Sequence, residues 1–188
     1  MLVLASQSPR RMELLTQLGV KFKQASADID ESVLPSEQAE VYVQRLAIEK
    51  ASAISRLHEG SDVWVLGADT TVVIDGKILG KPSDLVDAKH MLLALSGRSH
   101  QVHTGIALIK KEQVYSTIVT TNVVMTDISD NDIEQYWQTG EPQDKAGSYG
   151  IQGIGGKFVS KIDGSYSNVV GLPLVETAKL LKQAELIA

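Results

Sequence analysis

The chain has 188 residues, which favours one domain, and its 43% hydrophobic and 22% charged residues are typical of a folded globular protein. Its 18 basic and 23 acidic residues give a net charge of −5, which argues against a nucleic-acid polymer as partner, because such binders carry a basic surplus. The absence of cysteine excludes disulfides and thiolate metal sites and is compatible with the cytoplasm, where we expect the protein. No apolar stretch is long enough to span a bilayer, and the first residues lack the pattern of a secretory signal.

The N-terminal part begins with a predicted buried strand over Leu2–Ala5. Ser8 suits the N-cap of a following helix, Pro9 suits its first turn, and Gly19 suits its end. A second helix is predicted from Ser36 to about Leu57. Its apolar stripe consists of Val43, Leu46, Ala47, Ile54 and Leu57.

The rest of the chain alternates strand-like and helix-like segments. Strands are predicted over Val63–Leu66, Thr71–Ile74, Lys77–Leu79, Val102–Ile109, Val114–Val124 and Phe158–Ile162. Asp75-Gly76 predicts a hairpin turn, capping residues at Asp84 and Ser129 predict two helices, and a last helix starts near Pro173. Because helices alternate with strands and hairpins are mixed among them, the predicted fold class is α/β with a mixed sheet, in a single domain over residues 1–188.

The segment Ser6–Arg11 places hydroxyls and cations at the predicted start of a helix. Free backbone N–H groups and the helix dipole make such an end a site for anions. Arg10 and Arg11 in the first helical turn oppose that dipole unless something negative lies between them. A capped helix with a solvated basic pair is the alternative. Because Ser6, Ser8 and both arginines converge on one helix end, we favour phosphate binding.

Lys50 lies near the middle of the apolar stripe of the second predicted helix, projected at about 100° per residue. A lysine there extends its ammonium to solvent, pairs with a carboxylate, or reaches into a cleft. Because an unpaired ammonium in a core is costly, we predict a partner anion, either a side chain or a ligand.

Asp69 lies in Gly67-Ala68-Asp69-Thr70-Thr71, between two apolar β-like runs. Aspartate is depleted in strands, and Gly67 indicates a bulge or a close backbone approach. The carboxylate therefore either bonds its own turn or lies at a strand end, where it holds a divalent cation or acts on a water. The segment by itself leaves both interpretations open.

Two further segments carry charge next to glycine or proline. Lys81 stands in Gly80-Lys81-Pro82, where the proline favours extended backbone. Residues 141–153 crowd charged groups, glycines and the amide of Gln152 into one loop. Such a loop is either a plain surface connection or a place where glycine lets the backbone approach a ligand closely. Cations that hold phosphates and carboxylates that hold Mg²⁺ are what phosphate-ester or anhydride cleavage requires. The candidate cations are Arg10, Arg11, Lys50, Lys81 and Lys145, and the candidate carboxylates are Glu31, Asp69, Glu141 and Asp144.

Taken in order, these segments closely resemble the Maf family of nucleoside triphosphate pyrophosphatases. The matching segments are Ser6–Arg11, Arg45–Ala47 with Lys50, Gly67–Thr71, Gly80–Pro82, Glu141–Gly153 and Gly171–Leu174. The resemblance implies a mixed, curved central sheet flanked by helices, as in the inosine triphosphate pyrophosphatase-like (Maf/Ham) fold, with a cleft between two lobes. It also implies hydrolysis of a nucleoside triphosphate to the monophosphate and pyrophosphate with Mg²⁺ or Mn²⁺, as nucleotide-pool house-cleaning, by a homodimer.

The resemblance further implies a role for individual residues. Asp69 is expected to accept a proton from the attacking water, and Asp69 and Glu31 are expected to hold the metal. Lys50 and Lys81 are expected to neutralise the phosphates. The residues expected to line the phosphate end are Ser6, Ser8, Arg10 and Arg11.

The branches of the family differ at three places, which here are Arg11, Thr70 and Gln152. All three match the branch that resembles dTTP and UTP pyrophosphatases rather than the branch that prefers 7-methyl-GTP. A primary amide offers both a donor and an acceptor, which pair with the O4 and N3–H edge of uracil or thymine. We therefore expect dTTP and UTP as substrates, together with C5-modified UTP analogues, because thymine already carries a methyl group there.

Two other functions are alternatives to a pyrophosphatase. One is a nucleotide-binding regulator of cell division and septum formation that acts through partners, a role also associated with the family. A pure sensor does not need a catalytic base, so Asp69 favours the enzyme. The other is a phosphotransferase, for which the sequence offers no recognisable acceptor site.

Overall fold

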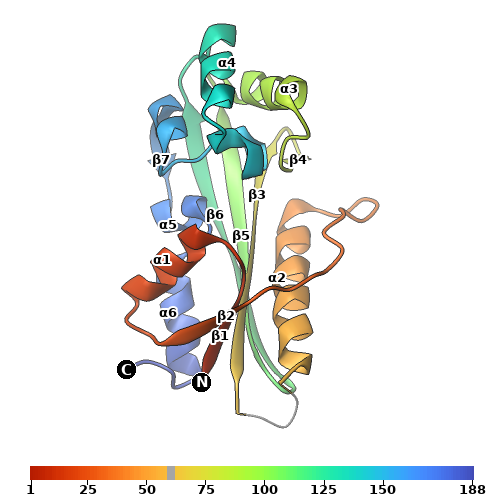
Figure 1. The fold of residues 1–188 in the computed structure, drawn as a ribbon, viewed down its shortest axis with the longest axis vertical. Helices are drawn as coiled ribbons and strands as arrows, with labels where there is room; N and C mark the ends of the chain where they lie inside the picture. The colour runs from red at the N-terminus through yellow and green to blue at the C-terminus, as the bar shows by residue number, and fades with distance from the viewer. Residues whose placement is uncertain (59–61) are drawn as a thin grey trace. The chain divides into compact units, whose positions relative to one another are not determined.

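The computed structural model describes residues 1–58 and 62–188 (Figure 1). Its strands are β1 (Leu2–Ala5), β2 (Phe22–Ala25), β3 (Trp64–Ile74), β4 (Lys77–Leu79), β5 (Ser99–Lys110), β6 (Gln113–Met125) and β7 (Val159–Asp163). Its α-helices are α1 (Pro9–Gln17), α2 (Ala39–Arg56), α3 (Leu85–Leu95), α4 (Asp130–Gln138), α5 (Tyr166–Val170) and α6 (Leu174–Gln183). Short 3-10 helices are η1 (Glu141–Asp144), η2 (Ala146–Ser148) and η3 (Ile154–Phe158).

The described strands form a mixed sheet in the order β2-β1-β3-β5-β6-β7, with β4 paired to β3. β1 runs parallel to β2 and β3, whereas β4 is antiparallel to β3 and β7 is antiparallel to β6. Asp75 and Gly76 join β3 to β4 with φ values of 51° and 72°, which are the positive angles of a type I′ hairpin. The predicted α/β class with a mixed sheet is confirmed.

Contacts divide the chain into two compact units. Unit 1 comprises residues 1–70, 104–119 and 171–188, and unit 2 comprises residues 71–103 and 120–170. In unit 1, α2 lies on one side of the strands, and α1 and α6 lie on the other side (Figure 1). In unit 2, α3 contacts α4. The single domain with two lobes and a cleft stays a prediction.

Each unit has its own hydrophobic core. The core of unit 1 contains Val3, Ala5, Ala47, Ala51, Ile54, Val63, Val65, Ala107 and Ile109. The core of unit 2 contains Val72, Ile74, Leu92, Leu95, Val102, Val123, Met125, Ile128, Ile133, Tyr136, Tyr149 and Phe158. Across residues 1–58 and 62–188, none of the helices combines the length and the hydropathy that a membrane crossing needs.

Two glycines let the backbone of α2 lie directly on the sheet. A Cβ atom on Gly67 of β3 would lie 2.2 Å from the carbonyl oxygen of Ala47, and one on Gly105 of β5 would lie 2.4 Å from that of Val43. The close backbone approach predicted for Gly67 is therefore confirmed. Because α2 is pressed against β3 here, side chains on the facing surfaces of the two elements meet at short range.

We expect Gly67→Ala to destabilise the fold, because the added methyl group overlaps backbone atoms of α2 that cannot rotate away. Overpacking of this kind costs about 1–3 kcal/mol of the free energy of unfolding, which denaturant titration measures. Gly80→Ala is the matched control, since a Cβ there meets no atom within 4 Å. Equal free energies of unfolding for the two variants would show that the contact between Gly67 and the backbone of α2 is not tight.

Three sequence predictions are wrong in detail. The segments predicted as two strands are one strand, β3, so Asp69 lies inside a strand and not at a strand end or in a turn. The second helix begins at Ala39, because Ser36 adopts a positive φ of 60° that an α-helix does not allow. Leu57 follows the last helical residue and is 77% exposed, so it is not part of the buried stripe.

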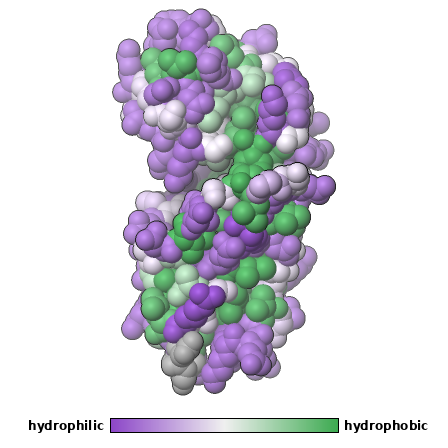
Figure 2. Space-filling model, turned by 90° about the vertical axis from the view of Figure 1, so that its right-hand side faces the viewer, coloured by the Kyte–Doolittle hydropathy of each residue, from purple (hydrophilic) through white to green (hydrophobic). Residues whose placement is uncertain are grey.

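Figure 2, which views the side on which α2 lies, shows hydrophobic and hydrophilic residues interspersed over unit 1.

Candidate functional site

The centre of the site is a buried lysine that contacts two carboxylates. Lys50 Nζ donates to Asp69 Oδ1 at 2.7 Å and lies 2.8 Å from Glu31 Oε1. Lys50 is 8% and Asp69 is 7% exposed, whereas the Glu31 side chain is half exposed. The predicted partner anion of Lys50 is therefore confirmed as a pair of side chains, and extension of the ammonium to solvent is excluded.

Local geometry explains why Lys50 and Asp69 meet. Successive strand residues point to opposite faces, so Asp69 shares a face of β3 with Gly67. Gly67 contacts the backbone of α2 at Ala47 and Ala51, which flank Lys50 in the helix. Because Gly67 has no side chain, α2 lies close enough to β3 for the ammonium of Lys50 to reach Asp69. The positive charge of the lysine compensates the negative charge of the aspartate inside the sheet.

The electrostatics of Asp69 favour proton uptake. Burial raises the pKa of Asp69 above its ordinary value, although the positive charges of Lys50 and Arg11 oppose the shift. A carboxylate with a raised pKa is a stronger proton acceptor than an exposed one. The arrangement is therefore suited to a general base, with the ammonium of Lys50 opposing the effect of burial on its pKa.

Side chains of α2 hold the segment that carries Glu31. Tyr42 donates its hydroxyl to the carbonyl of Glu31 at 2.9 Å, and Arg45 donates to the carbonyl of Ser32 at 3.0 Å. Arg45 also forms a salt bridge with Glu37 at 2.6 Å, whose hydrogen bonds lower the pKa of Glu37 to about 2. One helix thus supplies both Lys50 and the groups that position its second carboxylate. Sequence reasoning missed Tyr42, since a tyrosine on a helix has no distinctive pattern, and saw Arg45 only as part of a motif.

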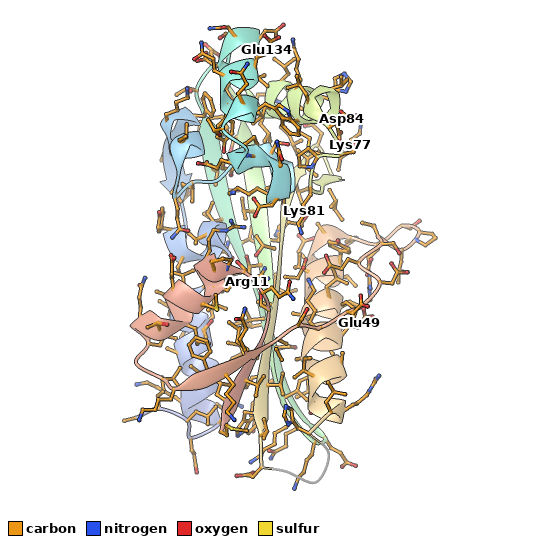
Figure 3. All side chains as sticks on the ribbon, viewed as in Figure 1. Arg11, Glu49, Lys77, Lys81, Asp84 and Glu134 are labelled. Atoms are coloured by element: carbon orange, nitrogen blue, oxygen red, sulfur yellow. The ribbon has the colours of Figure 1, made fainter. Side chains whose placement is uncertain are left out.

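The cationic start of α1 has a second set of contacts, in which Arg11 extends from the helix toward the strands (Figure 3). Arg11 Nε donates to the carbonyl of Gly171 at 2.8 Å, and its two Nη atoms contact Thr70 Oγ1 at 3.1 Å and Ser6 Oγ at 3.4 Å. Ser8 caps the helix by accepting from the backbone N–H of Arg11, as predicted. Two of the three expected selectivity residues, Arg11 and Thr70, thus contact each other, and Thr70 directly follows Asp69 in β3.

The contacts above do not include three of the expected residues, which are Arg10, Lys81 and Gln152. Arg10 is half-buried in the first turn of α1 of unit 1. Lys81 and Gln152 belong to unit 2, where both are exposed, Lys81 between β4 and α3 (Figure 3) and Gln152 between η2 and η3. Their roles, and the phosphate-binding role of Ser6, Ser8, Arg10 and Arg11, stay predictions.

The donor set for a divalent cation is small. Within the described ranges, no group of three or more His, Cys, Asp or Glu side chains is placed to hold a metal ion. Mg²⁺ in phosphate-transfer sites is commonly bound through one or two carboxylates together with substrate phosphates and water. Asp69 and Glu31, which contact the same ammonium from a strand and a loop, are two carboxylates of the kind that such a site uses.

A family model and curated relatives match nearly the whole chain. A family model described as "Maf-like protein" matches residues 1–184. A protein of Pseudoalteromonas atlantica named dTTP/UTP pyrophosphatase is 56% identical over 188 residues, covering 99% of this chain and 98% of its own. A protein of the same name from Hahella chejuensis is 55% identical, covering 97% and 91% of the two chains. The solved structure of a HAM1 protein from Coxiella burnetii covers 66% of this chain and 72% of its own, at 22% identity and a TM-score of 0.46.

Proposed function

Because the chain belongs to the family of Maf-like proteins, we propose that it is a nucleoside triphosphate pyrophosphatase that hydrolyses dTTP and UTP to the monophosphate and pyrophosphate. The observation that carries the proposal is the buried Asp69 carboxylate, with its raised pKa, beside the ammonium of Lys50. Relatives that share more than half of their residues with this chain and carry that name support it. The substrate is a small nucleotide rather than a nucleic-acid polymer.

In the proposed reaction, Asp69 accepts a proton from a water whose oxygen bonds to the α-phosphorus. The bond from that phosphorus to the oxygen bridging the α- and β-phosphates breaks, and pyrophosphate leaves with the electron pair. Lys50, which donates to Asp69, opposes the rise in the pKa of that carboxyl group and is proposed to stabilise the charge that develops on the phosphates. The family resemblance also assigns the neutralisation of phosphate charge to Lys81.

Asp69 and Glu31 are the residues that would hold Mg²⁺ or Mn²⁺ in this proposal. When bound, such a cation neutralises phosphate oxygens and polarises the phosphorus centre. Ser6, Ser8, Arg10 and Arg11 are proposed to bind the triphosphate, because the N-terminus of α1 adds backbone N–H groups and a partial positive charge. Homodimerisation and a cytoplasmic location stay predictions from the family resemblance.

The test is incubation with a panel of nucleoside triphosphates plus Mg²⁺ or Mn²⁺, with pyrophosphate and phosphate separated. Pyrophosphate and monophosphate in equal amounts support the proposal, whereas phosphate alone indicates cleavage at the γ-position and contradicts it. No turnover of any nucleotide would favour the alternative, a regulator of cell division acting through partners. The names of the relatives give no support to that alternative.

Base selectivity is expected to depend on Gln152. We expect hydrolysis of dTTP, UTP and C5-modified UTP well above dCTP, ATP and 7-methyl-GTP, because a site built for hydrogen bonds rejects analogues that lack the groups. Gln152→Glu should lower the ratio of kcat/KM for dTTP over dCTP by about 10-fold or more, since it replaces the amide donor with an acceptor. Gln143→Glu, at an exposed position in η1, is the matched control. A wild-type preference for a purine triphosphate would contradict this role for Arg11, Thr70 and Gln152.

A further inference from the structure

The carboxylate of Glu141 accepts hydrogen bonds from the backbone of the segment that carries Gln152. This segment, residues 150–155, is called the Gln152 loop. Glu141 Oε2 accepts from the backbone N–H of Ile154 at 2.8 Å, and Oε1 accepts from the N–H of Gly155 at 3.0 Å. Both donors lie at the C-terminal end of the loop, so this end is attached to one side chain of η1.

The N-terminal end of the Gln152 loop is attached to Tyr136, a residue of α4 that is 1% exposed. The hydroxyl of Tyr136 accepts from the backbone N–H of Gly150 at 3.0 Å and donates to Glu141 Oε1 at 2.7 Å. The two side chains therefore form one hydrogen-bonded pair that holds both ends of the loop. Gln152 lies between the two attachment points.

Two glycines of the Gln152 loop allow its backbone to lie close to the side chains of Glu141 and Tyr136. A Cβ atom on Gly153 would lie 2.2 Å from Glu141 Oε2, and one on Gly155 would lie 2.4 Å from the hydroxyl oxygen of Tyr136. The sequence suggested that glycines here let the backbone approach a ligand. At these two positions, the group that the backbone approaches is a side chain of the protein itself.

The hydrogen-bond donors around Glu141 favour the ionised form of its carboxyl group. Partial burial raises the pKa of Glu141, but hydrogen bonds from Gly155, Tyr136 and Ile154 outweigh burial, and the pKa falls below its ordinary value. An ionised carboxylate accepts these bonds without having to donate, and charge-assisted bonds of this kind are stronger than neutral ones. The loop is thus held by an anion that remains ionised at neutral pH.

We propose that Glu141, together with Tyr136, is a positioning residue that fixes the Gln152 loop and thereby sets the base selectivity of the enzyme. The inference rests on the proposed function and deepens it. An amide distinguishes uracil from cytosine only if its donor and acceptor are presented in one orientation, which requires a fixed backbone on both sides. In this proposal Glu141 acts through Gln152, because its carboxylate bonds the loop that carries this residue.

Glu141→Gln tests the proposal because it keeps the shape and replaces one acceptor oxygen with an amide that faces a backbone donor. We expect kcat/KM for dTTP relative to dCTP to fall about 10-fold, mainly through KM, with kcat for dTTP within about 3-fold of wild type. Tyr136→Phe should have a smaller effect in the same direction, since it keeps the ring contact with Phe158. Glu134→Gln, the same substitution at an exposed glutamate of α4, is the control.

A double-mutant cycle separates positioning from general damage. If Glu141 acts through Gln152, Glu141→Gln should leave the dTTP to dCTP ratio unchanged in a Gln152→Ala background. An equal fall in the turnover of dTTP and dCTP in Glu141→Gln would overturn the proposal. So would a double mutant whose dTTP to dCTP ratio falls by the product of the two single-mutant effects.

Amide hydrogen exchange provides a readout that does not depend on turnover. We expect exchange at Ile154 and Gly155 to accelerate in Glu141→Gln, because their acceptor is weakened. Unchanged exchange would overturn the proposal. Wild-type enzyme that releases no pyrophosphate from dTTP or UTP would instead contradict the proposed function and the selectivity role with it, while faster exchange would still identify Glu141 as the residue that holds the loop.

Discussion

Asp69→Asn is expected to lower kcat for dTTP by about 10²–10⁴-fold, the loss typical of removing a general base. The substitution is nearly isosteric, but an amide neither accepts the proton of the attacking water nor carries the charge that a cation requires. The protein should remain folded and bind nucleotide, since Lys50 retains Glu31 at 2.8 Å. Steady-state kinetics, nucleotide titration and thermal unfolding together measure these effects.

Asp75→Asn is the matched control for this substitution, because Asp75 is an exposed aspartate in the turn that follows the same strand. It should leave kcat unchanged. Activity of Asp69→Asn close to wild type would place the base elsewhere, and Glu31 would be the next candidate.

Lys50→Met is expected to lower kcat by about 10²–10³-fold, because it removes an ammonium that stabilises charge in the reaction. Methionine fills similar volume, so the core contacts of α2 are largely kept. Arg56→Met, an exposed cation at the end of the same helix, is the control. Intact catalysis in Lys50→Met would show that the lysine has only a structural role.

The same variant should change the pH dependence. Burial already raises the pKa of Asp69, and Lys50 is the strongest of the groups that oppose this shift. Removing Lys50 therefore raises the pKa further, and kcat/KM, which needs the carboxylate, should begin to fall at a higher pH on acidification. Because the folded-state pKa of Asp69 exceeds the unfolded value, the unfolding free energy of the variant should decrease as the pH rises between these two values. An acid limb that stays in place would contradict the role of Asp69 as the base.

The sequence by itself determined the elements that depend on local chemistry. Ser8 as a cap, the Asp75-Gly76 turn and the capping box that starts at Ser129 were predictable, because each involves hydrogen bonds or φ angles within a few residues. The periodicity of α2 also showed that Lys50 faces the core and needs an anion. Family resemblance then indicated Asp69 and Glu31 as candidates.

Only the tertiary structure decided how these residues are used. Asp69 lies within a continuous strand against its own β propensity, because an ammonium 19 residues away compensates its charge in the sheet. Arg11 bonds the carbonyl of Gly171, which is 160 residues distant, and no local pattern encodes that pairing. Glu141, which reads as one charge in a polar loop, instead holds the backbone at Ile154 and Gly155. In each case the determining partner is brought near by packing, and the energy of a buried charge or hydrogen bond depends on that partner rather than on neighbours in the sequence.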